Sequence, residues 1–120
     1  MASPLTIRTF TSRVFGQNAY LVRCGDAGGW VAIDPGGEAE AMADALDAAA
    51  EPLAAILLTH AHLDHLEGVA ALAERHPAPV HLHPADRPLY DAAGQQAAMF
   101  GHHIRTPPPP DAGLEDGQVL

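Results

Sequence analysis

The feature that most constrains the fold of this chain is an apolar run that ends directly in a cluster of histidines. Residues 53–58 read Leu-Ala-Ala-Ile-Leu-Leu, a continuous apolar stretch typical of a strand buried in the middle of a sheet. Residues 59–65 follow as Thr-His-Ala-His-Leu-Asp-His and hold three of the eight histidines of the chain. A buried strand that opens into such a loop predicts a functional site at the carboxyl end of a sheet.

The spacing of the polar residues in this loop favours metal binding. His60 and His62 are two residues apart, so on an extended segment they point to the same side. Asp64 continues the alternation, and His65 follows it directly. Imidazole and carboxylate groups are zinc ligands at about 2.0–2.2 Å. The first two histidines could hold one ion and the last two residues a second, about 3.5–4 Å away, so that the pair shares a hydroxide. We interpret the loop as a metal site and not as scattered surface histidines.

Hydrophobic periodicity predicts a mixed α/β layout around this loop. The expected strands are residues 5–10, 19–23, 30–33, 53–58 and 78–82, the first three as an antiparallel meander. The expected helices are residues 38–50, about 69–76 and 84–100. The apolar face of the first helix is expected to be Ala41, Met42, Ala45, Leu46 and Ala49. From residue 101 the chain is expected to be irregular, extended at prolines 107–110, with a strand starting near residue 119. The sheet should carry helices on at least one face.

Bulk properties exclude several functions. A chain of 120 residues forms one small domain. A formal net charge of −9, with six arginines and no lysine, argues against a nucleic-acid-binding surface. No apolar stretch approaches the roughly 20 residues that span a bilayer, and the N-terminus lacks the pattern of a secretory signal. We therefore expect a cytoplasmic protein without a membrane partner. The single cysteine, Cys24, excludes an internal disulfide and is expected to be a half-buried strand residue.

Residues 57–68, Leu-Leu-Thr-His-Ala-His-Leu-Asp-His-Leu-Glu-Gly, closely resemble the signature of the metallo-β-lactamase superfamily. Residues 15–22, Phe-Gly-Gln-Asn-Ala-Tyr-Leu-Val, and 32–37, Ala-Ile-Asp-Pro-Gly-Gly, also match that family. Together they are most similar to the glyoxalase II branch, the hydroxyacylglutathione hydrolases and their small bacterial relatives. Residues 79–84 and 114–117 fit the same branch, so the resemblance runs over nearly the whole chain.

The resemblance implies a fold and a reaction. The fold would be an αββα sandwich of the α/β (α+β) class, of which residues 1–120 supply about the first half as one partial domain. The reaction would be hydrolysis of a thioester of the acyl-glutathione type by a metal-bound hydroxide, oriented by Asp64 as the catalytic residue. The cofactors would be two zinc ions, with iron or manganese as alternatives, held by His60, His62, Asp64 and His65. Asp34 would accept hydrogen bonds that brace the metal loop, or serve only as a turn carboxylate before Pro35.

Part of the family pattern has no counterpart in these 120 residues: a third histidine, a bridging aspartate and a last histidine. We therefore expect a truncated domain in which each metal subsite keeps two protein ligands and binds metal poorly. His81, His83 and the pair at 102–103 are expected to be strand-end and loop histidines, not substitute ligands. Half a sandwich would leave an apolar sheet face open, which predicts self-association.

Two kinds of alternative remain open from the sequence. One is a truncated, non-catalytic or weakly metal-binding module that associates with another chain. The other is a different enzyme of the same superfamily: a lactonase, a subclass B3-type β-lactamase, an RNA-processing nuclease or a persulfide dioxygenase. The acidic charge argues against the nuclease. The motifs at 15–22 and 32–37 favour the thioesterase branch by resemblance, so we expect a small-molecule thioester substrate.

Overall fold

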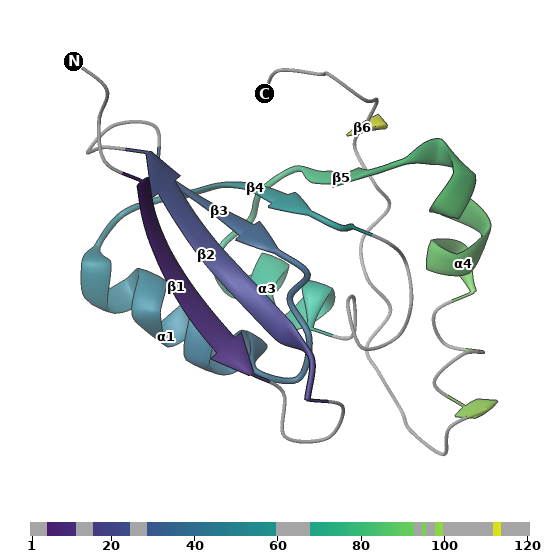
Figure 1. The fold of residues 1–120 in the computed structure, drawn as a ribbon, viewed down its shortest axis with the longest axis horizontal. Helices are drawn as coiled ribbons and strands as arrows, with labels where there is room; N and C mark the ends of the chain where they lie inside the picture. Colours follow the sequence, from purple (N-terminus) through teal and green to yellow (C-terminus); the bar gives the residue numbers. More distant parts are fainter. Residues whose placement is uncertain are drawn as a thin grey trace.

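A mixed sheet is the framework of the molecule (Figure 1). The computed structural model describes residues 5–11, 16–24, 29–59, 68–92, 95, 98–99 and 112–113. Within these ranges the strands are β1 (Leu5–Thr11), β2 (Asn18–Cys24), β3 (Trp30–Ile33), β4 (Leu53–Leu57), β5 (Val80–Leu82) and β6 (Ala112–Gly113). They lie in the order β1-β2-β3-β4-β5-β6. The pairs β1–β2 and β2–β3 are antiparallel, which confirms the expected meander, and the pairs from β3 to β6 are parallel.

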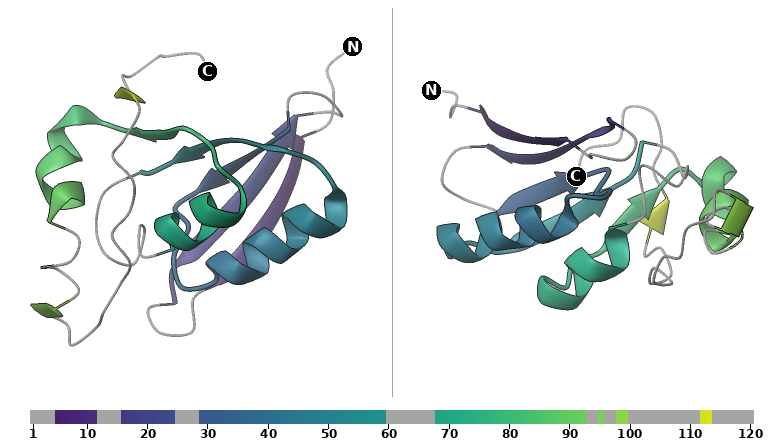
Figure 2. Two further views of the ribbon diagram at one scale, coloured as in Figure 1. Left: turned by 180° about the vertical axis from the view of Figure 1, so that it is seen from behind. Right: turned by 90° about the horizontal axis from the view of Figure 1, so that it is seen from below.

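Helices α1 (Ala39–Ala49) and α3 (Val69–Arg75) cover the same face of this sheet (Figure 2). A 3₁₀ turn, η1 (Pro84–Asp86), leads into the short helix α4 (Arg87–Asp91) beyond β5. None of the described helices is long and apolar enough to cross a membrane.

The helix expected over residues 84–100 is confirmed in part, because described residues 95 and 98–99 are helical and residues 84–91 form two helical elements. The chain forms η1 and then a separate helix, α4, that ends at Asp91. Pro88 has no N–H to continue the hydrogen-bond ladder of η1, but it is tolerated in the first turn of a new helix. Strand β6 was not expected, because two residues carry no periodic pattern. The predicted prolines 107–110 and the strand near residue 119 lie outside the described residues.

The core lies between the sheet and the two helices. A row of paired strand residues faces the helices and is 0–1% exposed: Leu21, Ala32, Ile56 and Val80. The buried side of α1 consists of Ala39, Met42, Ala43 and Leu46. Ala41 and Ala49, which we expected on that side, are exposed. Alanines lie on all sides of this helix, so hydrophobicity alone hardly distinguishes one side from another. The larger side chains of Met42 and Leu46 decide which side of the helix packs against the sheet.

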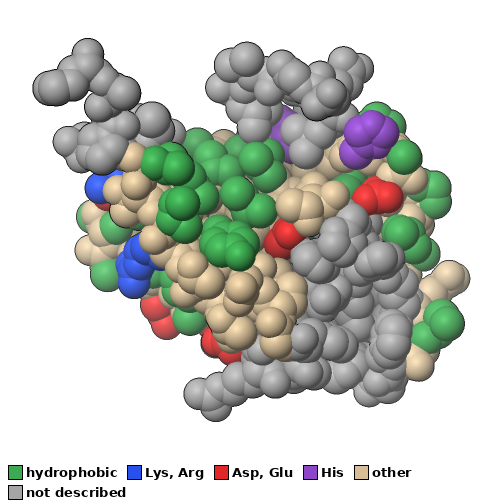
Figure 3. Space-filling view, in the orientation of Figure 1, with side chains coloured by type: hydrophobic (Ala, Val, Ile, Leu, Met, Phe, Trp, Pro, Cys, Tyr) green, Lys and Arg blue, Asp and Glu red, His purple; other side chains and the backbone are tan. Residues whose placement is uncertain are grey.

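The opposite face of the sheet carries apolar side chains that α1 and α3 do not cover. Tyr20, Ile33 and Leu57 follow one another across three strands and are half-buried. At the sheet edge Leu5 and Ile7 are 60% and 54% exposed. Hydrophobic side chains gather over β1 to β3 on this face in Figure 3. We call it the open sheet face.

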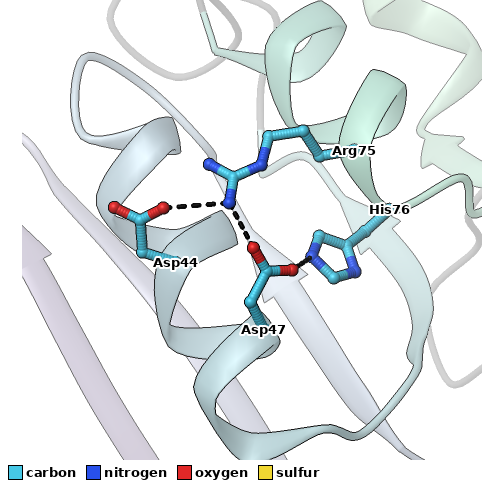
Figure 4. Close-up of polar contacts among 4 residues, drawn as sticks. All are labelled: Asp44, Asp47, Arg75 and His76. Carbon is cyan, nitrogen blue, oxygen red and sulfur yellow. Dashed lines mark hydrogen bonds and ion pairs between the residues drawn. The ribbon is translucent and has the colours of Figure 1, made fainter.

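A cluster of charged side chains ties α1 to α3 (Figure 4). Arg75 on α3 donates to Asp44, at 2.9 Å, and to Asp47, both on α1. His76 Nε2 lies 2.7 Å from Asp47 Oδ1. The hydrogen bond from the Arg75 guanidinium is the main cause that lowers the pKa of the Asp47 carboxyl. The carboxylates, Asp44 first, raise the pKa of Arg75 in return.

This cluster predicts a pH-dependent contribution to stability. The pKa of Asp47 is lower in the folded chain than in the unfolded one, so the contribution is present above about pH 4 and is lost as the pH falls through the folded value. We expect Asp47→Asn to lower the urea midpoint at neutral pH, and this deficit to shrink in acid. Urea unfolding of both proteins at about pH 7 and about pH 3 measures it. Glu40→Gln, on α1 outside the cluster, is the matched control. An equal deficit at both pH values would contradict the assignment.

Candidate metal site

The predicted metal ligands His60, His62, Asp64 and His65 lie outside the described residues. The structure describes the chain on both sides of them: β4 and Thr59 before, and Gly68 with α3 after. Among the described residues, no three His, Cys, Asp or Glu side chains come together in a group that could hold a metal ion. The geometry of the site is therefore the geometry of its two anchor points.

The first anchor is the carboxylate of Asp34, just after β3. Its Oδ1 accepts the backbone N–H of Thr59 at 2.7 Å, and its Oδ2 accepts the Thr59 hydroxyl at 2.6 Å. Asp34 is only 4% exposed. Hydrogen bonds to a carboxylate are among the stronger ones in proteins, and here both reach the residue next to His60. Asp34 thus fixes the point at which the histidine segment leaves the sheet.

The backbone of Asp34 is held as firmly as its side chain. Its φ of 53° lies in the left-handed region, which aspartate tolerates better than most residues. Its N–H donates to the carbonyl of Leu57 at 2.9 Å, which extends the pairing of β3 with β4. Its carbonyl accepts Nε2 of Gln17, which is 9% exposed, at 3.1 Å. Our reading of the sequence did not single out Gln17. The only signal was its place in the motif at residues 15–22.

The second anchor is Gly68, where the segment ends and α3 begins. Its N–H donates to the carbonyl of Pro35 at 3.0 Å. A Cβ on Gly68 would lie 2.2 Å from the carbonyl oxygen of Gly36 and 2.5 Å from the Cβ of Ala39. No L-residue with a side chain fits there without a shift of backbone. Residues 34–36 thus contact both ends of the histidine segment.

The described histidines outside the segment have local positions. His83 is exposed, and its Nδ1 accepts the N–H of Ala85 at 3.1 Å at the start of η1. His81 follows Leu57 in the pairing of β5 with β4, on the open sheet face, and its Nδ1 is buried without a hydrogen-bond partner in the described part of the chain. The pair at 102–103 lies outside the described residues.

The donor set of the segment fits a metal centre. Three imidazoles and one carboxylate within six residues are ligands that zinc, iron and manganese accept. The segment starts at the carboxyl end of β4, between two neighbours in the sheet, and both of its ends are tied to residues 34–36. Fixed ends reduce the conformational freedom that the chain would lose on binding an ion.

Comparison with known proteins agrees with these features. The family model of the metallo-beta-lactamase superfamily matches residues 12–119. The hydroxyacylglutathione hydrolase GloC of Haemophilus influenzae is 31% identical over 98 residues, which make up 81% of this chain and 46% of that protein. This chain therefore spans less than half the length of that relative.

Two solved structures have the same fold, one in a di-iron-bound form and one named as a B3 metallo-beta-lactamase. The crystal structure of TTHA1623 in a di-iron-bound form superimposes with a TM-score of 0.83 at 42% identity, covering 94% of this chain and 56% of that one. The B3 metallo-beta-lactamase BLEG-1 superimposes with a TM-score of 0.80 at 32% identity, covering 96% of this chain and 56% of that one. The chain thus spans a little over half the length of each of these two proteins.

Proposed function

The chain belongs to the metallo-beta-lactamase superfamily, and on this premise we propose that it carries half of the active site of a metal-dependent hydrolase of the glyoxalase II type. The substrate would be a small-molecule thioester, such as a hydroxyacylglutathione. The name of the Haemophilus influenzae relative supports this substrate class, as does the resemblance of residues 15–22 and 32–37 to that branch.

One observation carries the proposal: Asp34 binds the residue that leads directly into the sequence His-Ala-His-Leu-Asp-His. The buried Asp34 carboxylate accepts both donors of Thr59 and so fixes the direction of the chain at that point. His60, His62, Asp64 and His65 would hold the ions, zinc or, as in the di-iron form of TTHA1623, iron. Metal ions bound there would lower the pKa of water and polarise the carbonyl of the substrate.

The test is metal binding and turnover by the 120-residue chain and two variants. His62→Ala removes a proposed ligand, and His83→Ala removes an exposed histidine outside the segment. We expect the wild-type chain to bind Zn²⁺ weakly and His83→Ala to bind it equally well. Removal of a residue that only supports a metal ligand lowers metal affinity roughly 10–100-fold. His62→Ala removes a proposed ligand itself, so its loss of Zn²⁺ affinity should be larger. Chelator competition measures the affinity, and release of the thiol from a hydroxyacylglutathione measures turnover.

Two results would redirect the proposal. Equal Zn²⁺ affinity in His62→Ala and the wild type would remove the segment as the metal site. Turnover of a β-lactam in place of the thioester would favour the activity named for BLEG-1.

A second candidate is the module that binds another chain and has no activity of its own. The open sheet face favours it, because exposed Leu5 and Ile7 adjoin half-buried apolar side chains on β2 to β4. Light scattering on the same sample separates the candidates. A dimer without metal or turnover would support the module, and a metal-loaded, active chain would contradict it.

A further inference from the structure

The contacts of Gln17 point to a role beyond packing. Its side chain is almost fully buried, and the amide Nε2 donates to the carbonyls of Asn18 and Asp34. Asn18 is its own neighbour, whereas Asp34 lies 17 residues further along the chain. This buried amide links two distant parts of the chain, which indicates that it holds the orientation of the turn at Asp34.

The conformation of Asp34 explains what the contact achieves. A left-handed residue other than glycine is uncommon and persists when its surroundings hold it. Asp34 is held at its N–H by Leu57 and at its carbonyl by Gln17. With both backbone groups fixed, the direction of the Asp34 Cα–Cβ bond is fixed as well, and the carboxylate beyond it accepts both donors of Thr59.

We propose that Gln17 is a positioning residue for the candidate metal segment. It holds the Asp34 backbone so that the Asp34 carboxylate meets Thr59 immediately before His60. The inference rests on the proposed function for its consequence, metal affinity, but its structural step concerns only Gln17, Asp34 and Thr59, all of which are described.

The matched variants are Gln17→Met and Leu46→Ala. Methionine keeps roughly the length of the side chain and removes the donor. Leu46 lies in the core on α1 and contributes to stability through packing alone. Amide exchange of Thr59, whose N–H donates to Asp34, is compared with that of Leu58, whose N–H donates to the carbonyl of His81. A loss of stability changes both rates together, whereas a loss of position changes their ratio.

We expect Gln17→Met to raise the Thr59 exchange rate relative to Leu58 at least about fivefold, the factor that matches the net worth of one hydrogen bond. We also expect it to lower Co²⁺ affinity about 10-fold and to alter the d–d absorption bands of bound Co²⁺. Leu46→Ala should leave the exchange ratio and the bands unchanged.

The outcomes separate the two proposals. An unchanged exchange ratio in Gln17→Met overturns the positioning role, whatever the metal does. Wild-type protein that binds no Co²⁺ overturns the proposed function, while a changed ratio in the same sample still supports Gln17 as the residue that positions Thr59. Altered Co²⁺ bands in Gln17→Met, with the changed ratio, support both.

Discussion

Asp34→Ala is expected to lower both stability and metal affinity more than any other single change at the anchors. The variant removes the acceptors of the Thr59 N–H and hydroxyl, and it leaves alanine in a left-handed conformation that aspartate tolerates better. Each hydrogen bond to a charged group contributes about 1.5–3 kcal/mol, so we expect a loss of about 3 kcal/mol or more in the free energy of unfolding. Zn²⁺ affinity should fall about 10–100-fold. Urea unfolding and chelator competition measure the two effects.

Asp34→Asn is the matched control. Asparagine tolerates the left-handed region and keeps one carbonyl oxygen as an acceptor, but it loses the charge. We therefore expect it to recover most of the stability and only part of the metal affinity. An alanine variant that unfolds at the wild-type midpoint and binds Zn²⁺ normally would show that the two hydrogen bonds are incidental.

Gly68→Ala is expected to have the second-largest effect, for a purely steric reason. The backbone of Gly68 has an ordinary φ of −97°, so alanine is not strained by its own conformation. Its Cβ would, however, lie 2.2 Å from the Gly36 carbonyl oxygen and 2.5 Å from the Ala39 Cβ. Neither atom is at the end of a flexible side chain, so α3 must move away from residues 34–36. We expect a loss at the upper end of the overpacking range, about 3 kcal/mol, together with weaker Zn²⁺ binding.

A double variant tests this explanation. Ala39→Gly removes one of the two obstructing atoms and leaves the Gly36 carbonyl in place. Combined with Gly68→Ala, it should restore part of the lost metal affinity and shift the thermal midpoint back toward that of Ala39→Gly alone. Strict additivity of the two changes would indicate that the collision is not the cause.

The sequence predicted the elements well where their patterns are local. Strand β3 has the expected bounds, and β1, β2, β4 and β5 differ from the expected strands by one or two residues at one or both ends. Alternation in strands and helical spacing are properties of neighbouring residues, so they are visible without a fold. The helix expected over residues 84–100 was confirmed only in part, because it begins as the 3₁₀ turn η1 and α4 ends at Asp91, before the helical residues 95 and 98–99.

The burial pattern was less predictable. The side of α1 that packs could not be assigned from its alanines, because Ala41 and Ala43 have the same side chain and only one of them meets the core. The open sheet face was expected from the resemblance to a two-layered sandwich. Its exposed residues, Leu5 and Ile7, became visible only when the register of β1 with β2 was known.

By itself, the sequence determined the donor set of the candidate site and its position directly after the buried strand β4. These depend on residue types and on their spacing, which a folded structure does not change. The family resemblance had implied that Asp34 braces this segment. The tertiary structure decided that it does so through Thr59, and added Gln17 at the same end and Pro35 with the space around Gly68 at the other. Those contacts join residues from about 17 to 33 positions apart, and a hydrogen bond between distant positions leaves no local pattern in a sequence to be read.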